Sequence, residues 1–333
     1  MTDTQPAPPT VPPAATPAHL HWSAETLWQQ LEPYLPGISI EVLARAESTN
    51  TLLLERARMG GGRHDAPITT PGELEAQRQR GLARDERGGP YGRRSGDTQP
   101  CLLVAEHQTL GRGRLGRGWL SAPGASLTFS VGLPLAPRDW SGLSLAVGVA
   151  LADAIEPPEP GAPAPRIGLK WPNDLWLVDG PGAGRKLGGV LIETVAVGGR
   201  RMVVVGVGLN ISPLGAAAGS ASVPMTHGHA SVQELVPAAT APSVLHGVAL
   251  PLVRALLQFE REGFAGFAVA YERRDLLRGQ RITALDTSRA DASQEGIAEG
   301  VAPSGALRLR GDDGTLHEIT SGEVSIRLTA RDS

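Results

Sequence analysis

The chain has 333 residues, of which 41% are hydrophobic and 20% charged, a composition typical of a globular protein of about two domains. Its formal net charge of −3 creates no basic field, so we expect no DNA binding, and its single cysteine excludes a disulfide framework or a cysteine-rich metal site. The first residues do not resemble a secretory signal, and the longest mostly apolar run, residues 143–155, is shorter than a bilayer span. We therefore expect a cytoplasmic protein without membrane attachment.

Lysine and asparagine are scarce in this arginine-rich chain. Only Lys170 and Lys186 are lysines among the 31 basic residues, and Asn50, Asn173 and Asn210 are the only asparagines. Together with the abundance of Ala, Gly, Pro and Arg, this indicates a GC-rich gene that disfavours lysine and asparagine codons. Arginine replaces lysine easily on a surface, but not where a compact ammonium group is needed. These five residues therefore mark candidate functional positions, although coincidence is the alternative.

The N-terminal part mixes predicted structure with predicted disorder. In chain order we expect a disordered, proline-rich tail over 1–20, a helix over 22–34 capped by Ser23, a strand over 38–43, a helix over 49–57 begun by Ser48, and a largely disordered insertion at about 58–98. The interleaved acidic residues of the insertion favour a solvated loop over a nucleic-acid-binding arm.

The central part combines hairpins with helices. Strands are predicted over 102–106, 126–133, 169–171, 175–178, 187–195 and 201–209, and helices over 143–155 and 244–270, the second with Phe259, Phe264 and Phe267 facing the core. Because several strands form hairpins, we expect a mixed sheet of the α/β (α+β) class and not a doubly wound parallel sheet. The predicted catalytic domain spans 21–275.

The C-terminal part is predicted to be a second, smaller domain over 276–330. Short strands are expected over 280–284, 295–301, 306–310, 316–319 and 324–328, separated by turns. About fifty residues of this kind form a small β-barrel.

The most informative segment is GRGRLGRGW, Gly111–Trp119, directly after a predicted strand. Its arginines and glycines offer guanidinium groups and bare backbone N–H groups together, which suits a closely approached anion such as a phosphate or acyl-phosphate. The spacing matches neither the dinucleotide fingerprint nor the phosphate loop. An RGG-like nucleic-acid arm is the alternative, but the segment occurs once, between two strands.

Three further segments add polar groups to predicted turns and strands: KWPND at 170–174, RKLGG at 185–189 and GVGLN at 206–210. The first would present an amide and a carboxylate on a turn, and the second a lysine in a strand whose glycines admit a ligand. Each alone also fits an ordinary turn or strand. Together, and in this order, they indicate one functional site.

With Ser48-Thr49-Asn50 and Gln108, these segments resemble the biotin protein ligase family over roughly residues 22–328. The resemblance implies a mixed-sheet catalytic domain related to class II aminoacyl-tRNA synthetases and lipoate ligases, followed by an SH3-like β-barrel. The chain departs from the family at Gly188, where many members have alanine. Residues 1–46 offer one helix where bifunctional members have a winged-helix domain, so the resemblance implies a monofunctional ligase without a DNA-binding domain.

The resemblance also implies a reaction. Biotin and Mg²⁺-ATP form biotinyl-5′-AMP, and biotin passes to a lysine on the biotin carboxyl carrier domain of acetyl-CoA carboxylase or a related carboxylase. The implied catalytic cations are Lys186, Arg112 and Arg114. Biotin would be bound by Ser48, Thr49, Asn50, Gln108, Arg112, Gly113, Arg114, Lys186 and Gly188. ATP and the adenylate would be bound by Arg114, Arg117, Trp119, Lys170, Asn173, Asp174 and Asn210.

The resemblance places Trp119 against adenine but leaves the contacts to ribose, phosphates and Mg²⁺ undivided among Asn173, Asp174 and Asn210. Three other functions stay open at this point. A lipoate or octanoate ligase would share the fold and the chemistry, a nucleic-acid-binding regulator could use the arginines and the barrel, and a remnant could bind biotin without turnover.

Overall fold

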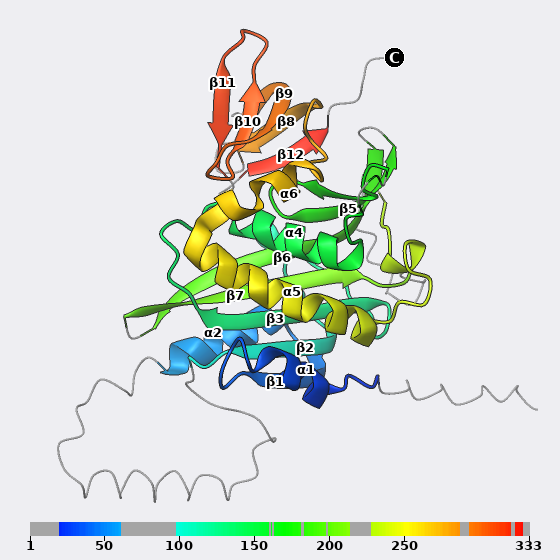
Figure 1. The fold of residues 1–333 in the computed structure, drawn as a ribbon, viewed down its shortest axis with the longest axis vertical. Coiled ribbons are helices and arrows are strands. Elements are labelled where there is room, and N and C mark those ends of the chain that lie inside the picture. Colours follow the sequence, from blue (N-terminus) through cyan, green and yellow to red (C-terminus); the bar gives the residue numbers. More distant parts are fainter. Residues whose placement is uncertain are drawn as a thin grey trace, which may run out of the picture.

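A computed structural model describes residues 20–60, 98–159, 161, 163–180, 183–197, 199–213, 228–286 and 293–320, together with the backbone of 324–328. The tail predicted over 1–20 and the insertion predicted at about 58–98 lie almost entirely outside these residues. Figure 1 shows a larger α/β part and a smaller β part at the C-terminal end of the chain.

The larger part is built on a seven-stranded sheet of order β1-β2-β3-β7-β6-β5-β4. Its strands are β1 (Ser39–Ala46), β2 (Cys101–Gln108), β3 (Ser126–Pro134), β4 (Ile167–Lys170), β5 (Asp174–Gly180), β6 (Ala183–Val197) and β7 (Arg200–Asn210). Only β1 and β2 pair in parallel, and every other neighbouring pair is antiparallel. The predicted mixed sheet is therefore confirmed.

Helices cover both faces of this sheet. On one face lie α1 (Ala24–Leu31), α4 (Leu143–Ile155) and α5 (Ala241–Glu262), and α2 (Thr49–Gly60) lies on the other. Strand β7 shows the division, because Val203, Val205 and Val207 enter the large core under α4 and α5 whereas Val204 packs with α2. Since strand side chains alternate between faces, the even-numbered positions 206, 208 and 210 share the α2 face.

The starts of α1 and α5 differ in how they are capped. Ser23 precedes α1 as predicted, but its side chain makes no capping hydrogen bond and its φ is 45°. Helix α5 begins three residues before the predicted start, because Thr240 and Ser243 cap each other: the Ser243 N–H donates to Thr240 Oγ1 at 3.2 Å and the Thr240 N–H to Ser243 Oγ at 2.9 Å.

The predicted helix over 244–270 ends earlier than expected. Gly263 at its C-cap has φ 64°, and a 3₁₀ turn η3 (Gly263–Phe267) separates α5 from α6 (Ala268–Glu272). Positive φ values favour glycine, which explains the break. The three predicted core phenylalanines are buried, with at most 6% of each exposed.

Within the described residues, one helical segment, Ala241–Glu272, is long and apolar enough by length and composition to cross a membrane, although no span was predicted from the sequence. Half of its most apolar stretch is buried inside the protein, and Leu245, Leu252 and Phe259 are inaccessible to solvent. These are the properties of a core helix.

The smaller part is a five-stranded antiparallel sheet of order β11-β10-β9-β8-β12. Its five strands correspond to the five short strands that were predicted. Its strands are β8 (Arg281–Asp286), β9 (Ser293–Val301), β10 (Leu307–Arg310), β11 (Leu316–Ile319) and β12 (Val324–Leu328). The turn before β10 rests on the larger part: Trp171 Nε1 donates to the Gly305 carbonyl at 3.0 Å.

Candidate active site

A buried polar network surrounds the start of α2 on the face of the sheet opposite α4 and α5. Thr49 and Asn50 are each only 3% exposed. The Thr49 N–H donates to Gln108 Oε1 at 2.7 Å, and Ser130 Oγ of β3 lies 2.6 Å from both Thr49 Oγ1 and Asn50 Oδ1. An amide oxygen only accepts, so Ser130 donates to Asn50 and accepts from Thr49. Such satisfied networks fix side-chain positions.

Glu193 of β6 extends this network to the arginine-rich loop. Its two carboxylate oxygens accept separate hydrogen bonds, one from Asn50 Nδ2 at 3.0 Å and one from Arg112 Nη2 at 2.8 Å. Arg112 Nη1 also donates to Thr51 Oγ1 at 3.2 Å. Arg112 is thereby held over α2 and β6, beside the buried asparagine.

The segment 111–119 closes on itself as a compact loop that contains the 3₁₀ turn η1 (Arg114–Gly116). The Trp119 N–H donates to the Gly111 carbonyl at 2.8 Å, and the Gly113 N–H to the Arg117 carbonyl at 2.7 Å. Arg114 reaches out of the loop, and its Nη1 donates to Asn173 Oδ1 at 3.3 Å. Burial lowers the pKa of Arg114 below its ordinary value, although Asp174 opposes the shift.

Asp174 lies among the cations of the predicted site. Lys186 Nζ forms an ion pair with its Oδ1 at 2.7 Å. Lys170 Nζ lies 4.5 Å from the ring centre of Trp176, and burial lowers the pKa of Lys170 to about 8 even though Asp174 attracts its charge. Both lysines of the chain therefore lie around this carboxylate.

The glycines of GVGLN make room for other site residues of the protein. A Cβ at Gly206 would lie 2.2 Å from Asn50 Oδ1, and one at Gly208 would lie 2.5 Å from Trp119 Cε2. The Trp119 ring thus lies directly on β7, 5.8 Å from Lys186 Nζ. Among the described residues no group accepts a hydrogen bond from its buried indole N–H.

Gly188 packs closely against β7. A Cβ at this position would lie 2.6 Å from the Gly208 carbonyl oxygen and 2.5 Å from Leu209 Cδ2. An alanine would therefore force β6 and β7 to shift apart locally.

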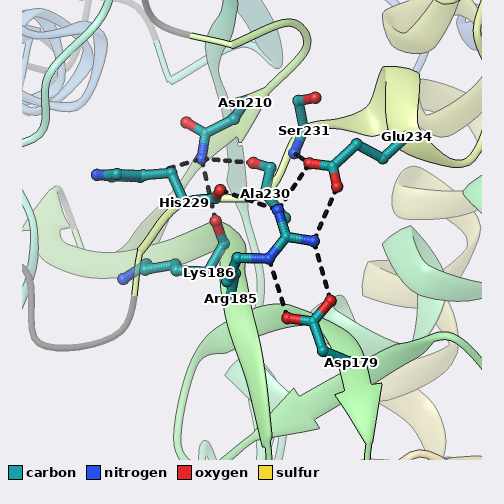
Figure 2. A network of polar contacts seen from close by, with 8 residues as sticks. All are labelled: Asp179, Arg185, Lys186, Asn210, His229, Ala230, Ser231 and Glu234. Carbon is teal, nitrogen blue, oxygen red and sulfur yellow. Dashed lines mark hydrogen bonds and ion pairs between the residues drawn. The ribbon is translucent and has the colours of Figure 1, made fainter.

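Asn210 ends β7 beside Lys186 (Figure 2). Its Nδ2 donates to the carbonyls of Lys186 and Ala230, each at 3.1 Å, and lies 3.4 Å from His229 Nδ1. The pKa of His229 is lowered by burial and by the charge of Lys186. Asn210 thus holds main chain as well as facing the predicted site.

The structure brings the predicted site residues into two adjoining clusters. Ser48, Thr49, Asn50, Gln108 and Arg112 form the first, and Trp119, Lys170, Asn173, Asp174, Lys186 and Asn210 form the second. Arg114 reaches from the loop of the first cluster to the second, and Arg117 of the same loop is exposed but close enough to affect the pKa of Lys170.

Sequence reasoning missed Ser130, Glu193 and His229. The available signal was weak: Ser130 is one of three hydroxyl residues in β3, and Glu193 is the one carboxylate of β6. In the described part of the chain, no group of three His, Cys, Asp or Glu residues could hold a metal ion.

Two family descriptions match the chain. The biotin/lipoate A/B protein ligase family matches residues 94–210, and the biotin protein ligase C-terminal domain matches residues 278–327. The bifunctional ligase/repressor BirA of Escherichia coli (strain K12) is 30% identical over 302 residues, which cover 90% of this chain and 77% of that protein. The chain belongs to the biotin protein ligase family. It is therefore a ligase.

Other biotin protein ligases agree with this assignment. The biotin–[acetyl-CoA-carboxylase] ligase of Paracoccus denitrificans is 34% identical over 218 residues, which cover 64% of this chain and 85% of that protein. The biotin protein ligase of Aquifex aeolicus, solved in complex with biotin and ATP, has the same fold: its TM-score is 0.59 at 24% identity, with 87% of this chain and 99% of that chain covered. The match at 278–327 spans the five strands of the smaller part and supports the predicted fold class.

Proposed function

We propose that this ligase activates biotin with ATP to biotinyl-5′-AMP and transfers biotin to a lysine on the carrier domain of acetyl-CoA carboxylase or a related carboxylase. The observation that carries the proposal is the pair of adjoining clusters, one a buried network of amides and hydroxyls and the other rich in cations, with Arg114 reaching from the first to the second. The names of the relatives and the biotin and ATP in the Aquifex aeolicus structure point to the same reaction.

In the first half-reaction, a carboxylate oxygen of biotin attacks the α-phosphorus of ATP, and the bond to pyrophosphate breaks. Two anions must meet, so the site must supply positive charge where charge develops. Lys186, Arg112 and Arg114 supply it. Lys186 and Arg112 are held by Asp174 and Glu193, and each can exchange that carboxylate for an anionic oxygen of the reactants.

The buried cluster suits the ureido ring of biotin. A cyclic urea has one carbonyl that accepts hydrogen bonds and two N–H groups that donate them. Hydroxyl and amide side chains can donate to the carbonyl and accept from the N–H groups. Ser48, Thr49, Asn50 and Gln108 would bind the ring, the backbone at Gly113 and Gly188 would flank the ligand, and Arg112, Arg114 and Lys186 would face its carboxylate.

The second cluster suits the nucleotide. Trp119 would contact adenine, and Arg114, Arg117, Lys170, Asn173, Asp174 and Asn210 would bind ribose and phosphates. Mg²⁺ is commonly held by one or two carboxylates together with substrate phosphates. Asp174 offers one carboxylate and Asn173 an amide oxygen, which fits a metal that arrives with the nucleotide and neutralises its phosphates.

In the second half-reaction, the neutral amine of the carrier lysine attacks the acyl carbon of the mixed anhydride, and AMP leaves. We assign binding and chemistry to a catalytic domain over 21–275, followed by a barrel over 276–330. The proposal places the enzyme in the cytoplasm and involves neither DNA nor a membrane.

Pyrophosphate release from Mg²⁺-ATP tests the proposal, with biotin, lipoate or no acid added to the purified chain. We expect release with biotin alone. Release with lipoate would assign the chain to the sister activity, and no release with either acid would contradict the proposal. A carrier domain added after the biotin reaction should then become biotinylated at one lysine.

A further inference from the structure

Arg185 directly precedes Lys186 in β6, and the two side chains point away from each other (Figure 2). The Arg185 guanidinium forms ion pairs with two carboxylates. Its Nε and Nη2 donate to the two oxygens of Asp179 on β5, each at 2.9 Å. Its Nη1 and Nη2 donate to the two oxygens of Glu234 at 3.1 and 2.8 Å. Glu234 belongs to the 3₁₀ turn η2 (Val232–Glu234), so the contact joins the β5–β6 hairpin to a distant segment.

This distant segment, residues 228–234, also holds the main chain of Lys186. The Lys186 N–H donates to the Gly228 carbonyl at 3.3 Å, and the Ala230 N–H donates to the Lys186 carbonyl at 2.9 Å. Arg185 Nη1 adds a bond to the His229 carbonyl at 3.3 Å. The segment that Arg185 fixes is therefore the one that lies against Lys186.

The sheet alone leaves the position of Lys186 weakly defined. Lys186 pairs with Trp176, but Gly188 pairs with Leu175, so the register of β5 and β6 shifts immediately after Lys186. A β-bulge of this kind re-aims a side chain and interrupts the ladder. Asp174 holds the ammonium end at 2.7 Å, so an additional restraint at this point acts on the main chain from which the side chain extends.

We propose that Arg185 is a positioning residue: by joining Asp179 to Glu234 it holds segment 228–234 against Lys186 and fixes the ammonium that faces the reacting groups. This inference rests on the proposed function. The three side chains are 34%, 41% and 35% exposed, and exposed ion pairs add little to global stability. The planar guanidinium makes four hydrogen bonds to the two carboxylates, which the three donors of an ammonium group cannot reproduce.

The test compares Arg185→Gln and Arg185→Lys with a matched control, Arg281→Gln. Arg281 donates to both oxygens of Asp312, at 3.2 and 2.7 Å. This ion pair also lies at the surface, but in the smaller sheet. Biotin-dependent pyrophosphate release gives kcat and KM, and thermal unfolding gives Tm. Misplacing a catalytic group by about 1 Å reduces rate on the order of a hundredfold.

We expect kcat of Arg185→Gln to fall by about tenfold to a hundredfold with the KM for biotin unchanged, as for an interaction made in the transition state. Arg185→Lys should keep most of this defect, and Arg281→Gln should keep the wild-type kcat. A wild-type kcat in Arg185→Gln, or full rescue by lysine, would overturn the inference. If Arg185→Gln does not fold, Asp179→Asn removes one of the two carboxylates and gives the same test.

A double-mutant cycle separates positioning from a structural role. The affinity for a non-hydrolysable biotinyl-adenylate analogue is measured for Arg185→Gln, Lys186→Ala and the double variant. If Arg185 acts through Lys186, the double variant binds no more weakly than Lys186→Ala, whereas additive losses would contradict the inference. A wild-type enzyme that releases no pyrophosphate with biotin would overturn the proposed function itself, which distinguishes the two failures.

Discussion

Lys170 shows how burial sets the pH range in which a single side chain is charged. Only 9% of it is exposed, and burial lowers its pKa to about 8, so its ammonium loses a proton far earlier than an ordinary lysine. If its charge helps to bind the phosphates of ATP, this contribution is complete below pH 7 and disappears as the pH rises through 8. The pH dependence of kcat/KM reports such a free-enzyme pKa.

We therefore predict that kcat/KM for ATP falls on the alkaline side with an apparent pKa near 8. Lys170→Gln should lose about tenfold to a hundredfold in kcat/KM at pH 7, in line with the removal of one hydrogen bond to a charged group, and should lack the alkaline fall. Lys170→Arg stays charged and should move the fall to higher pH. An unchanged fall in Lys170→Arg would assign it to another group.

At the residue scale, the scarcity of lysine and asparagine was a useful signal. Lys170 and Lys186 lie around Asp174, while Asn50 lies in the buried network. Ser130 and Glu193 escaped prediction because serine and glutamate are common, and only the folded sheet brings them to Asn50. Scarcity draws attention to the rare residues but gives no information about their neighbours.

The start of α2 depends on strands from distant parts of the sequence. Ser130 of β3 and Glu193 of β6 satisfy the Asn50 side chain, and Gln108 of β2 satisfies the first N–H of the helix. Sequence periodicity predicted both the helix and the strands, because these are local properties. It did not predict the bonds between them, which depend on strand order and register. The boundary of α5 was missed because the reciprocal cap of Thr240 lies before the apolar pattern.

Ser130→Ala tests this network. It leaves the buried Asn50 Oδ1 without a donor, while the Thr49 hydroxyl keeps Gln108 Oε1 at 3.2 Å, and it should lower the free energy of unfolding by about 1–3 kcal/mol. We also expect a higher KM for biotin. Chemical denaturation measures the free energy of unfolding, and pyrophosphate release measures KM. Thr128→Val is the control. Thr128 lies on the same strand as Ser130, and among the described residues its Oγ1 donates only to the Ala105 carbonyl of β2, at 2.7 Å. It should lose stability with an unchanged KM, and an equal rise in KM would contradict a specific role for Ser130.

For the whole molecule, the turn before β10 connects the smaller sheet to the predicted nucleotide site. Gly305 has φ 83°, accepts a hydrogen bond from Trp171 and lies so close to Gly142 that a Cβ would approach its Cα to 2.7 Å. Trp171 directly precedes the turn that carries Asn173 and Asp174. The sequence predicted both parts of the molecule but not this contact, because nothing local indicates which turn meets which surface.

Gly305→Ala should therefore disturb the whole enzyme, and Gly314→Ala is its matched control. Gly314 has φ 80° with no heavy atom within 4 Å of an added methyl group, so both variants carry the same backbone strain of about 1–2 kcal/mol. Only Gly305→Ala adds the clash, for a further loss of about 1–3 kcal/mol, together with a raised KM for ATP. Equal unfolding free energies and equal KM values would show that the contact is dispensable.

A row of positions across the sheet has a consequence for how this enzyme tolerates change. Asp174, Gly189, Gly208 and Thr128 pair in succession across β5, β6, β7 and β3. A methyl group at Gly189 would lie 3.2 Å from Asp174 Oδ1, and one at Gly208 would displace the Trp119 ring. In a saturation mutagenesis screen, Gly208 should rank with the charged site residues among the least replaceable positions, although it has no side chain to contribute.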